Sequence, residues 1–91
     1  MSETARLRVS KHVRGERWAQ RSADPVMNPV DAWADATEIF GHGLDGDEVR
    51  YHEHSETVLV RKDDTLVTVI DATTAKRSVR HAIHHFGGGS A

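Results

Sequence analysis

The sequence predicts an α+β domain with the element order β-α-α-β-β-β-α, in which two helices pack on a small antiparallel sheet and a basic amphipathic helix follows. Two observations carry this prediction. Helical signals dominate residues 11–40, and three strand-like runs then follow one another between residues 49 and 70. The chain has 91 residues, 37% of them hydrophobic and 29% charged, which is typical of one small domain. We expect a single domain over residues 1–86 and a flexible Gly/Ser tail over residues 87–91.

The N-terminal segment predicts a short strand followed by a helix. Residues 5–9 alternate polar and apolar side chains, which is the period of a strand. Ser10 is suited to capping a helix over residues 11–21, whose apolar side is thin. Gly15 lies inside this helix and costs about 1 kcal/mol relative to alanine, so we expect the helix to bend there or to depend on tertiary contacts.

The second helix has the clearest boundary signals in the chain. Asn28 and Pro29 place a capping side chain directly before a proline at the first helical position. Gly41 is a natural stop, so the helix is predicted to run to about Phe40. Trp33 and Phe40 are the expected core anchors of an apolar stripe formed by Val30, Trp33, Ala34, Thr37 and Phe40.

Three runs rich in β-branched residues follow a glycine-rich loop and are predicted to be strands. The last two, residues 57–62 and 66–70, are separated by Asp63–Asp64, which predicts a hairpin with a tight turn. Both are almost continuously apolar, so we expect both faces of the hairpin to be partly covered. The first run, residues 49–54, alternates instead and places its polar side chains, those of Arg50, His52 and His54, on one face.

A final helix is predicted over residues 72–86, with Asp71 suited to capping it. Its apolar stripe consists of Ala75, Val79, Ala82, Ile83 and Phe86. Basic side chains and histidines cover much of the remaining surface, namely Lys76, Arg77, Arg80, His81, His84 and His85. Cations near the C-terminal end of a helix also suit its dipole.

The charges are distributed unevenly along the chain. Residues 1–22 carry a net charge of +4, residues 23–57 carry −8 and residues 58–91 carry +2. Such a chain presents a basic face for nucleic acid, unless the opposite signs simply cancel on the folded surface. Cysteine is absent, which excludes disulfides and thiolate catalysis. No apolar run has the length of a membrane span and no secretory signal is seen, so we expect a cytoplasmic protein without membrane association.

Two short segments resemble the RelE-like ribonucleases, within the wider barnase–EndoU–colicin–RelE group. The first is His12-Val-Arg-Gly-Glu-Arg17-Trp18-Ala-Gln-Arg21, which is similar to a helix of the form His-Ala-x-x-Arg-Trp/Met-x-x-Arg in that group. The second comprises the strands Val58-Leu-Val-Arg61 and Leu66-Val-Thr68-Val69. The resemblance covers about residues 6–70. It implies a two-helix unit packed on a sheet whose open face holds RNA, and an antitoxin-like protein partner.

Metal-independent RNA cleavage requires acid–base groups and a cation that stabilises the pentacoordinate phosphorane. Histidine suits the acid–base roles and arginine suits the phosphorane, because its planar fork donates two hydrogen bonds. The candidate catalytic residues are therefore His52, His54 and Arg61, with His12 as an alternate base. The candidate RNA-binding residues are Arg17, Arg21, Arg50 and Tyr51. No cofactor is expected.

Other interpretations compete with the ribonuclease. The histidines at His52 and His54, and at His81, His84 and His85, have spacings that hold zinc or nickel, although no carboxylate completes a known metal pattern. Alternatively, the chain is a noncatalytic assembly or adaptor protein of viral or mobile-element origin. Its acidic middle segment would then meet a basic region of an identical chain and form a homo-oligomer. The singled-out histidines and arginines would in that case be ordinary solvated surface groups.

Overall fold

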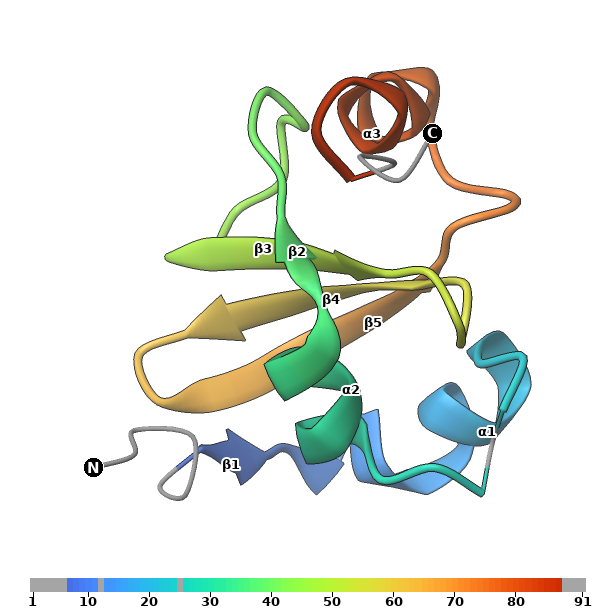
Figure 1. Ribbon diagram of the computed structural model, residues 1–91. Helices are drawn as coiled ribbons and strands as arrows, with labels where there is room; N and C mark the ends of the chain where they lie inside the picture. Colours follow the sequence, from blue (N-terminus) through green and yellow to red (C-terminus); the bar gives the residue numbers. More distant parts are fainter. Residues whose placement is uncertain (1–6, 12, 25, 88–91) are drawn as a thin grey trace.

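A five-stranded mixed sheet lies between two helical layers in the computed structural model, which describes residues 7–11, 13–24 and 26–87 (Figure 1). The strand order is β1-β5-β4-β3-β2. The strands are β1 (Arg8–Val9), β2 (Thr37–Glu38), β3 (Glu48–His52), β4 (Thr57–Lys62) and β5 (Thr65–Asp71). The α+β class predicted from the sequence is confirmed.

The predicted hairpin forms the centre of the sheet. β4 and β5 pair antiparallel, with Lys62 opposite Thr65 across the two-residue turn. Asp63 adopts a left-handed φ of 58°, the conformation that such a tight turn requires. Residues 57–60 are all buried because helices cover both faces of β4, as their continuous apolar pattern predicts.

The sheet differs from the predicted antiparallel one at both edges. β1 pairs parallel to β5, with Arg8 opposite Thr65. At the other edge, the unpredicted strand β2 pairs antiparallel to β3, with Thr37 opposite Tyr51. The parallel pair makes the sheet mixed. Because β1 and β5 lie far apart in the sequence, no local pattern predicts that they pair.

The first helical segment packs on one face of the sheet. A wide π-helical turn, η2 (Val13–Arg17), precedes the helix α1 (Trp18–Arg21) and contains Gly15, where a bend was expected. The Ser10 side chain accepts a hydrogen bond from the Val13 amide at 3.2 Å and so caps this segment, as predicted. The core on this face consists of Val13, Trp18, Ala32, Trp33, Leu59, Leu66 and Val69.

The helix α2 (Pro29–Asp35) begins where the sequence predicts and ends earlier. Asn28 caps it by accepting a hydrogen bond from the Val30 amide at 2.9 Å. The predicted continuation to Phe40 is wrong, because Ala36 is extended and the chain then joins the sheet as β2. The extended backbone buries Ile39 in the core and leaves the Phe40 side chain 52% exposed, so Phe40 is not the expected core anchor.

The last helix covers the opposite face of the sheet. It comprises α3 (Arg77–Ala82) and a π-helical turn η3 (Ile83–Gly87), and it begins five residues later than predicted. Asp71 does not cap it; its carboxylate instead accepts hydrogen bonds from the amide and hydroxyl of Thr73 in the connection. The buried core on this face consists of Ile39, Val49, Val58, Val60, Ala72, Ala75, Val79 and Ala82. The sheet face that the resemblance would leave open is therefore covered by α3.

Candidate functional site

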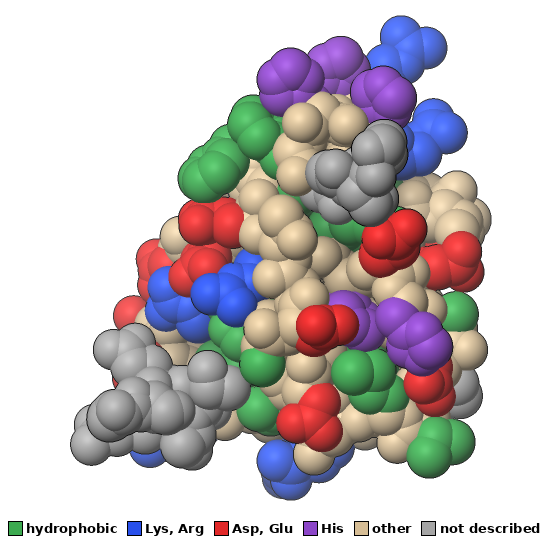
Figure 2. Space-filling model, in the orientation of Figure 1, with side chains coloured by type: hydrophobic (Ala, Val, Ile, Leu, Met, Phe, Trp, Pro, Cys, Tyr) green, Lys and Arg blue, Asp and Glu red, His purple; other side chains and the backbone are tan. Residues whose placement is uncertain are grey.

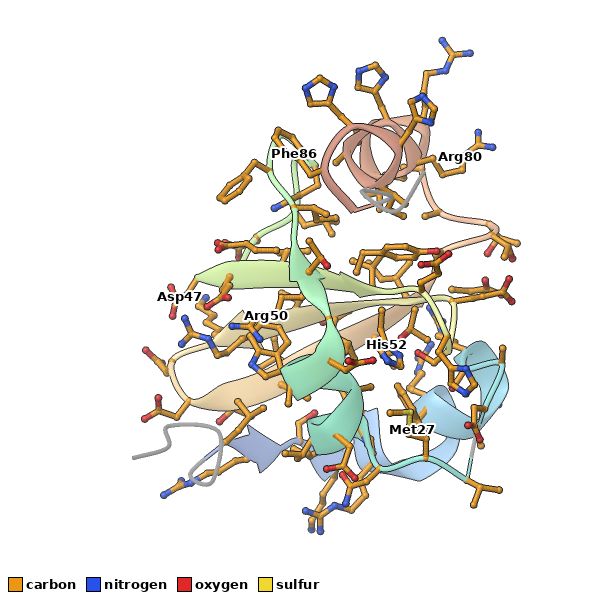
Figure 3. All side chains as sticks on the ribbon, viewed as in Figure 1. Met27, Asp47, Arg50, His52, Arg80 and Phe86 are labelled. Atoms are coloured by element: carbon orange, nitrogen blue, oxygen red, sulfur yellow. The ribbon has the colours of Figure 1, made fainter. Side chains whose placement is uncertain are left out.

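Polar side chains gather at two places on the α1–α2 face of strands β3 and β4. Arg50 and His52 point to this face from alternate positions of β3, as the period of two predicts (Figure 3). We call Glu48, Arg50 and Arg61 the arginine cluster. We call the group of Asp24, Asp35, His52 and His54 the histidine cluster. The C-terminal end of α2 and the strand β2 cross the sheet between Arg50 and His52 in the view of Figure 3.

The arginine cluster is an ion-pair network centred on Glu48. The Arg50 Nε donates to one Glu48 carboxylate oxygen at 2.7 Å, and the Arg61 Nη2 donates to the other at 3.2 Å. Arg61 also donates to the carbonyl oxygen of Asp63. Because β3 and β4 pair with Glu48 opposite Arg61, the network lies at the end of the sheet nearest the β4–β5 turn.

The surroundings of the arginine cluster offset its positive charge. Asp47 lies beside it and accepts a hydrogen bond from the Asp63 amide at 2.6 Å. The carboxylates of Asp47 and Glu48 equal the guanidinium groups of Arg50 and Arg61 in number. The cluster is thus a mixed-charge network, in which both arginines already have carboxylate or carbonyl partners.

His52 is the buried member of the histidine cluster, with only 1% of its side chain exposed. Its Nδ1 lies 2.7 Å from the Ser55 hydroxyl and accepts the Ser55 amide proton at 3.3 Å. With Nδ1 as the acceptor, Nε2 carries the proton and donates to the Asp35 carboxylate at 3.1 Å. The Ser55 hydroxyl also bonds to that of Thr57 at 2.7 Å. His52 therefore links the end of α2 to the turn after β3, and both of its ring nitrogens are hydrogen-bonded.

His54 is the accessible member of the cluster, with 66% of its side chain exposed. It lies in the turn over residues 53–56, and its Nε2 donates to the Asp24 carboxylate at 2.9 Å. This hydrogen bond is the main reason that the pKa of Asp24 is held below the ordinary aspartate value of 3.8. The His52 and His54 rings lie 6.0 Å apart, edge to face. Two imidazoles and two carboxylates thus meet at one corner of the sheet.

Arg61 does not join the predicted catalytic histidines. In the β3–β4 ladder, His52 lies opposite Thr57, whereas Arg61 lies opposite Glu48. Thr57 and Arg61 are four residues apart on one strand, which corresponds to about 13 Å. Both partners of the Arg61 guanidinium, Glu48 and Asp63, lie at the far end of the ladder. The structure brings Arg61 together with Arg50 and brings His52 together with His54.

The C-terminal end of α1, which carries Arg21, lies beside the histidine cluster. Arg17 and Arg21 are both half-buried, Arg21 at the C-terminal end of α1. The Ala23 amide donates to the Ser55 carbonyl at 2.8 Å, which places the end of α1 beside the turn that carries His54. His12 lies outside the described residues.

Tyr51 lies on the other face of β3 and packs against the core beneath α3. Partial burial, followed by the charges of Glu53 and Glu56, raises the pKa of its hydroxyl above 10.0. It therefore faces away from Arg50 and His52.

The residues that complete the histidine cluster were not anticipated. Asp24, Asp35 and Ser55 were not among the predicted site residues. Each contacts a histidine that is 17 or 30 positions away in the sequence, or in the case of Ser55 three positions away across a turn. The one local signal was the pattern His52-Glu-His54-Ser55, a turn in which Ser55 bonds back to His52.

Two features of the described residues bear on the metal-binding interpretation and on membrane association. Within the described part of the chain, no three histidine, aspartate or glutamate side chains are arranged to hold a metal ion. No helix among those residues is long and apolar enough to cross a membrane.

A groove of about 810 Å³ lies between β1, α1 and the connection before α2. Arg8, Arg14, Trp18 and Met27 are among the residues that line it, and none of the predicted site residues is. This groove is separate from both clusters.

A family model described as a "putative RelE superfamily toxin domain" matches residues 9–73, from the end of β1 to just beyond β5. No curated protein and no solved structure matches the chain.

Proposed function

Because the chain belongs to the RelE superfamily toxin domain family, we propose that it is a ribonuclease toxin in which His54 supplies acid–base chemistry at the cleaved phosphate. The family match over residues 9–73 carries the assignment to RNA. The choice of His54 rests on its exposed imidazole, which a carboxylate already orients.

The pairing with Asp24 suits His54 to act as a general base. With Nε2 donating to the Asp24 carboxylate, Nδ1 is left with its lone pair and faces no partner among the described residues. A carboxylate in this position fixes the tautomer and stabilises the imidazolium that forms when the base takes up a proton. His52, by contrast, has both nitrogens engaged and almost no exposure, so we assign it the role of positioning the turn that carries His54.

The proposed reaction uses the RNA itself as the nucleophile. The His54 Nδ1 removes the proton of a ribose 2′-hydroxyl, and the 2′-oxygen attacks the adjacent phosphorus. The bond from phosphorus to the 5′-oxygen of the next nucleotide breaks, that oxygen takes up a proton from water as it leaves, and the His54 imidazolium returns its proton to water. The products are a 2′,3′-cyclic phosphate and a free 5′-hydroxyl. This reaction needs neither a redox partner nor a metal.

Arginine side chains would bind the phosphates of the strand. Arg21 ends α1, and the Ala23 amide that follows bonds to the turn carrying His54, so we assign Arg21, and Arg17 one turn earlier, to the phosphates beside the cleaved bond. Arg61 lies about 13 Å along the sheet from the His52 end of the β3–β4 ladder, and the Arg50 guanidinium is held at Glu48 beside it, which fits a phosphate further along the strand better than the phosphorane. Membership of the family also implies a protein antitoxin as the partner that restrains the activity in the cell.

The test is cleavage of a structured RNA with and without EDTA by the wild type and by His54→Gln, Asp24→Asn and Arg61→Ala. Glu53→Gln is the matched control, because Glu53 is an exposed acid in the same turn. We expect EDTA-resistant cleavage with cyclic phosphate ends, and a loss of about 100-fold or more in His54→Gln. Asp24→Asn should lose less, since it leaves the imidazole in place.

Two outcomes would overturn the proposal. Intact RNA over a wide range of protein concentration would favour the noncatalytic adaptor instead. Full activity in His54→Gln would remove the residue from the mechanism. A loss of cleavage in Arg61→Ala as large as that in His54→Gln would indicate that Arg61 stabilises the phosphorane.

A further inference from the structure

Two phenylalanine side chains lie together on the surface beside α3. Phe40 follows β2, and Phe86 lies in η3; their rings are 5.3 Å apart at 80°. They remain 52% and 40% exposed. The ring of His85 lies 4.7 Å from that of Phe86, again edge to face. We call Phe40, His85 and Phe86 the aromatic platform (Figure 3 labels Phe86).

The packing of the domain does not account for the aromatic platform. Both cores are closed by other side chains, and Ile39 fills the buried position next to Phe40. Leaving two large apolar rings in water forgoes the gain of burial, which is about 25 cal/mol per Å² of apolar surface. Exposed apolar groups that cluster in this way mark a binding surface.

The surroundings of the aromatic platform differ on its two sides: acidic side chains lie toward the sheet, and the histidines and cations of α3 lie toward the helix (Figure 2). No acidic residue follows Asp71 in the sequence. Lys76, Arg77 and Arg80 are exposed on and before α3, and three histidines crown the helix at the top of the molecule (Figure 2). The rings of His81 and His85 lie parallel, 6.4 Å apart. Such a surface attracts a polyanion and would repel a partner of basic character.

Aromatic rings next to cations bind single-stranded nucleic acid, because bases stack on the rings while the cations contact phosphates. We propose that the aromatic platform and the cations of α3 form a binding surface for an unpaired segment of RNA. Bases stack on Phe40, Phe86 and His85, and the strand continues across α3 to Arg77 and Arg80, which contact the phosphates; Arg80 lies on the other side of the helix from Phe86 (Figure 3). This inference rests on the proposed function for the choice of RNA as ligand.

The surface is separate from the proposed cleavage site. α3 covers one face of the sheet, whereas α1 and the histidine cluster lie on the other (Figure 1). It also lies beyond residues 9–73, which the family model matches, apart from Phe40. Stacking here would hold a part of the substrate several nucleotides away from the cleaved bond and would make the enzyme prefer unpaired RNA.

The experiment measures binding without cleavage. The probe is a short fluorescein-labelled single strand of 2′-O-methyl RNA, which lacks the nucleophilic hydroxyl, and affinity is read by fluorescence anisotropy. The proteins are the wild type, Phe40→Ala, Phe86→Ala, Phe86→Leu and Phe86→Trp. Val26→Ala serves as a matched control, because Val26 is an exposed apolar residue remote from α3 in the fold. Circular dichroism checks that each variant is folded.

We expect Phe86→Ala to raise the Kd about 10-fold, which is the effect of losing one stacked base. Phe86→Leu should behave like the alanine variant, since it keeps apolar area and loses the ring. Phe86→Trp should bind as well as the wild type, and the same strand annealed to its complement should bind more weakly. Unchanged affinity in both alanine variants would overturn the inference, as would equal affinity for the duplex.

The inference and the proposed function fail in different ways. If the wild type does not cleave RNA but Phe86→Ala weakens binding, the catalytic proposal falls and the binding surface remains. If RNA affinity is unchanged but Phe40→Ala and Phe86→Ala dissociate an oligomer seen by light scattering, the platform is a protein interface and the inference falls.

Discussion

Arg50 covers the indole ring of Trp33 and also bonds to the backbone of the same residue. Its guanidinium carbon lies 4.3 Å from the ring centroid, and its Nη1 donates to the Trp33 carbonyl at 2.9 Å. The Nε meanwhile donates to Glu48. One side chain thus joins the edge of β3 to the last turn of α2 by stacking, by a backbone hydrogen bond and by an ion pair.

We therefore predict that Arg50→Lys lowers the free energy of unfolding by about 1–2 kcal/mol, although the charge is kept. Lysine has no planar group to stack on Trp33, and it does not make both hydrogen bonds at once. Urea unfolding measures the difference, with Arg80→Lys on exposed α3 as the control. Equal stability of Arg50→Lys and the wild type would mean that this contact contributes no net free energy.

His52→Asn is predicted to lower the free energy of unfolding by about 2–3 kcal/mol, because it leaves buried polar partners at Ser55 without their acceptor. Its RNA cleavage per folded molecule should stay near that of the wild type, since His52 is nearly inaccessible. Chemical unfolding and cleavage measured on the same preparations separate the two effects. His84→Asn, at an exposed position, is the control for stability. A stable but inactive His52→Asn would assign His52 to the chemistry.

The pair of Asp24 and His54 predicts a feature in the acid range. The pKa of Asp24 is lowered in the folded protein, so its contribution to stability is present above the ordinary value of 3.8 and is lost as the pH falls through the folded pKa. Asp24→Asn should therefore resemble the wild type more closely at the most acidic pH than at neutral pH. Urea unfolding across the acid range measures this. A stability difference independent of pH would show that the carboxylate charge is not what matters.

Gly46 is predicted to tolerate no side chain. A Cβ built there would lie 2.5 Å from the Val60 Cγ1 and 3.2 Å from the Arg61 carbonyl oxygen. Gly46→Ala should thus lower the free energy of unfolding by about 1–3 kcal/mol, through overpacking against β4. In the Gly46→Ala background, Val60→Ala should cost less than it does alone, because it removes the clashing atom. Strict additivity of the two substitutions would contradict this explanation.

The sequence predicts those elements whose signals are local. Asn28 and Pro29 start α2, Asp63–Asp64 turns the central hairpin, and the apolar run of β4 indicates burial on both faces; all three are observed. The end of α2 was missed because Thr37 and Phe40 continue the helical spacing. The helix ends earlier because the edge of β3 is free to pair with Thr37 and because Ile39 fills a position in the core.

The sequence predicted which residue types form the candidate site. It did not predict which of these residues lie together. The period of two placed Arg50 and His52 on one face, and both lie there. The ladder register then separates Arg61 from the histidines, and no spacing in the sequence reveals which residue of β3 lies opposite Arg61. Asp24 reaches His54 from a connection that lies thirty residues earlier in the chain, and only the fold joins them.

The parallel pairing of β1 with β5 has a consequence for the order in which the chain folds. Lys62 and Thr65 close the central hairpin over a two-residue turn, whereas Arg8 meets Thr65 only after most of the chain lies between them. Closing so long a loop is entropically more costly and slower than closing a hairpin. In pulse-labelling hydrogen exchange during refolding, the amides of β4 and β5 should become protected first and those of β1 last. During synthesis, β1 would therefore stay unpaired until β5 has been made.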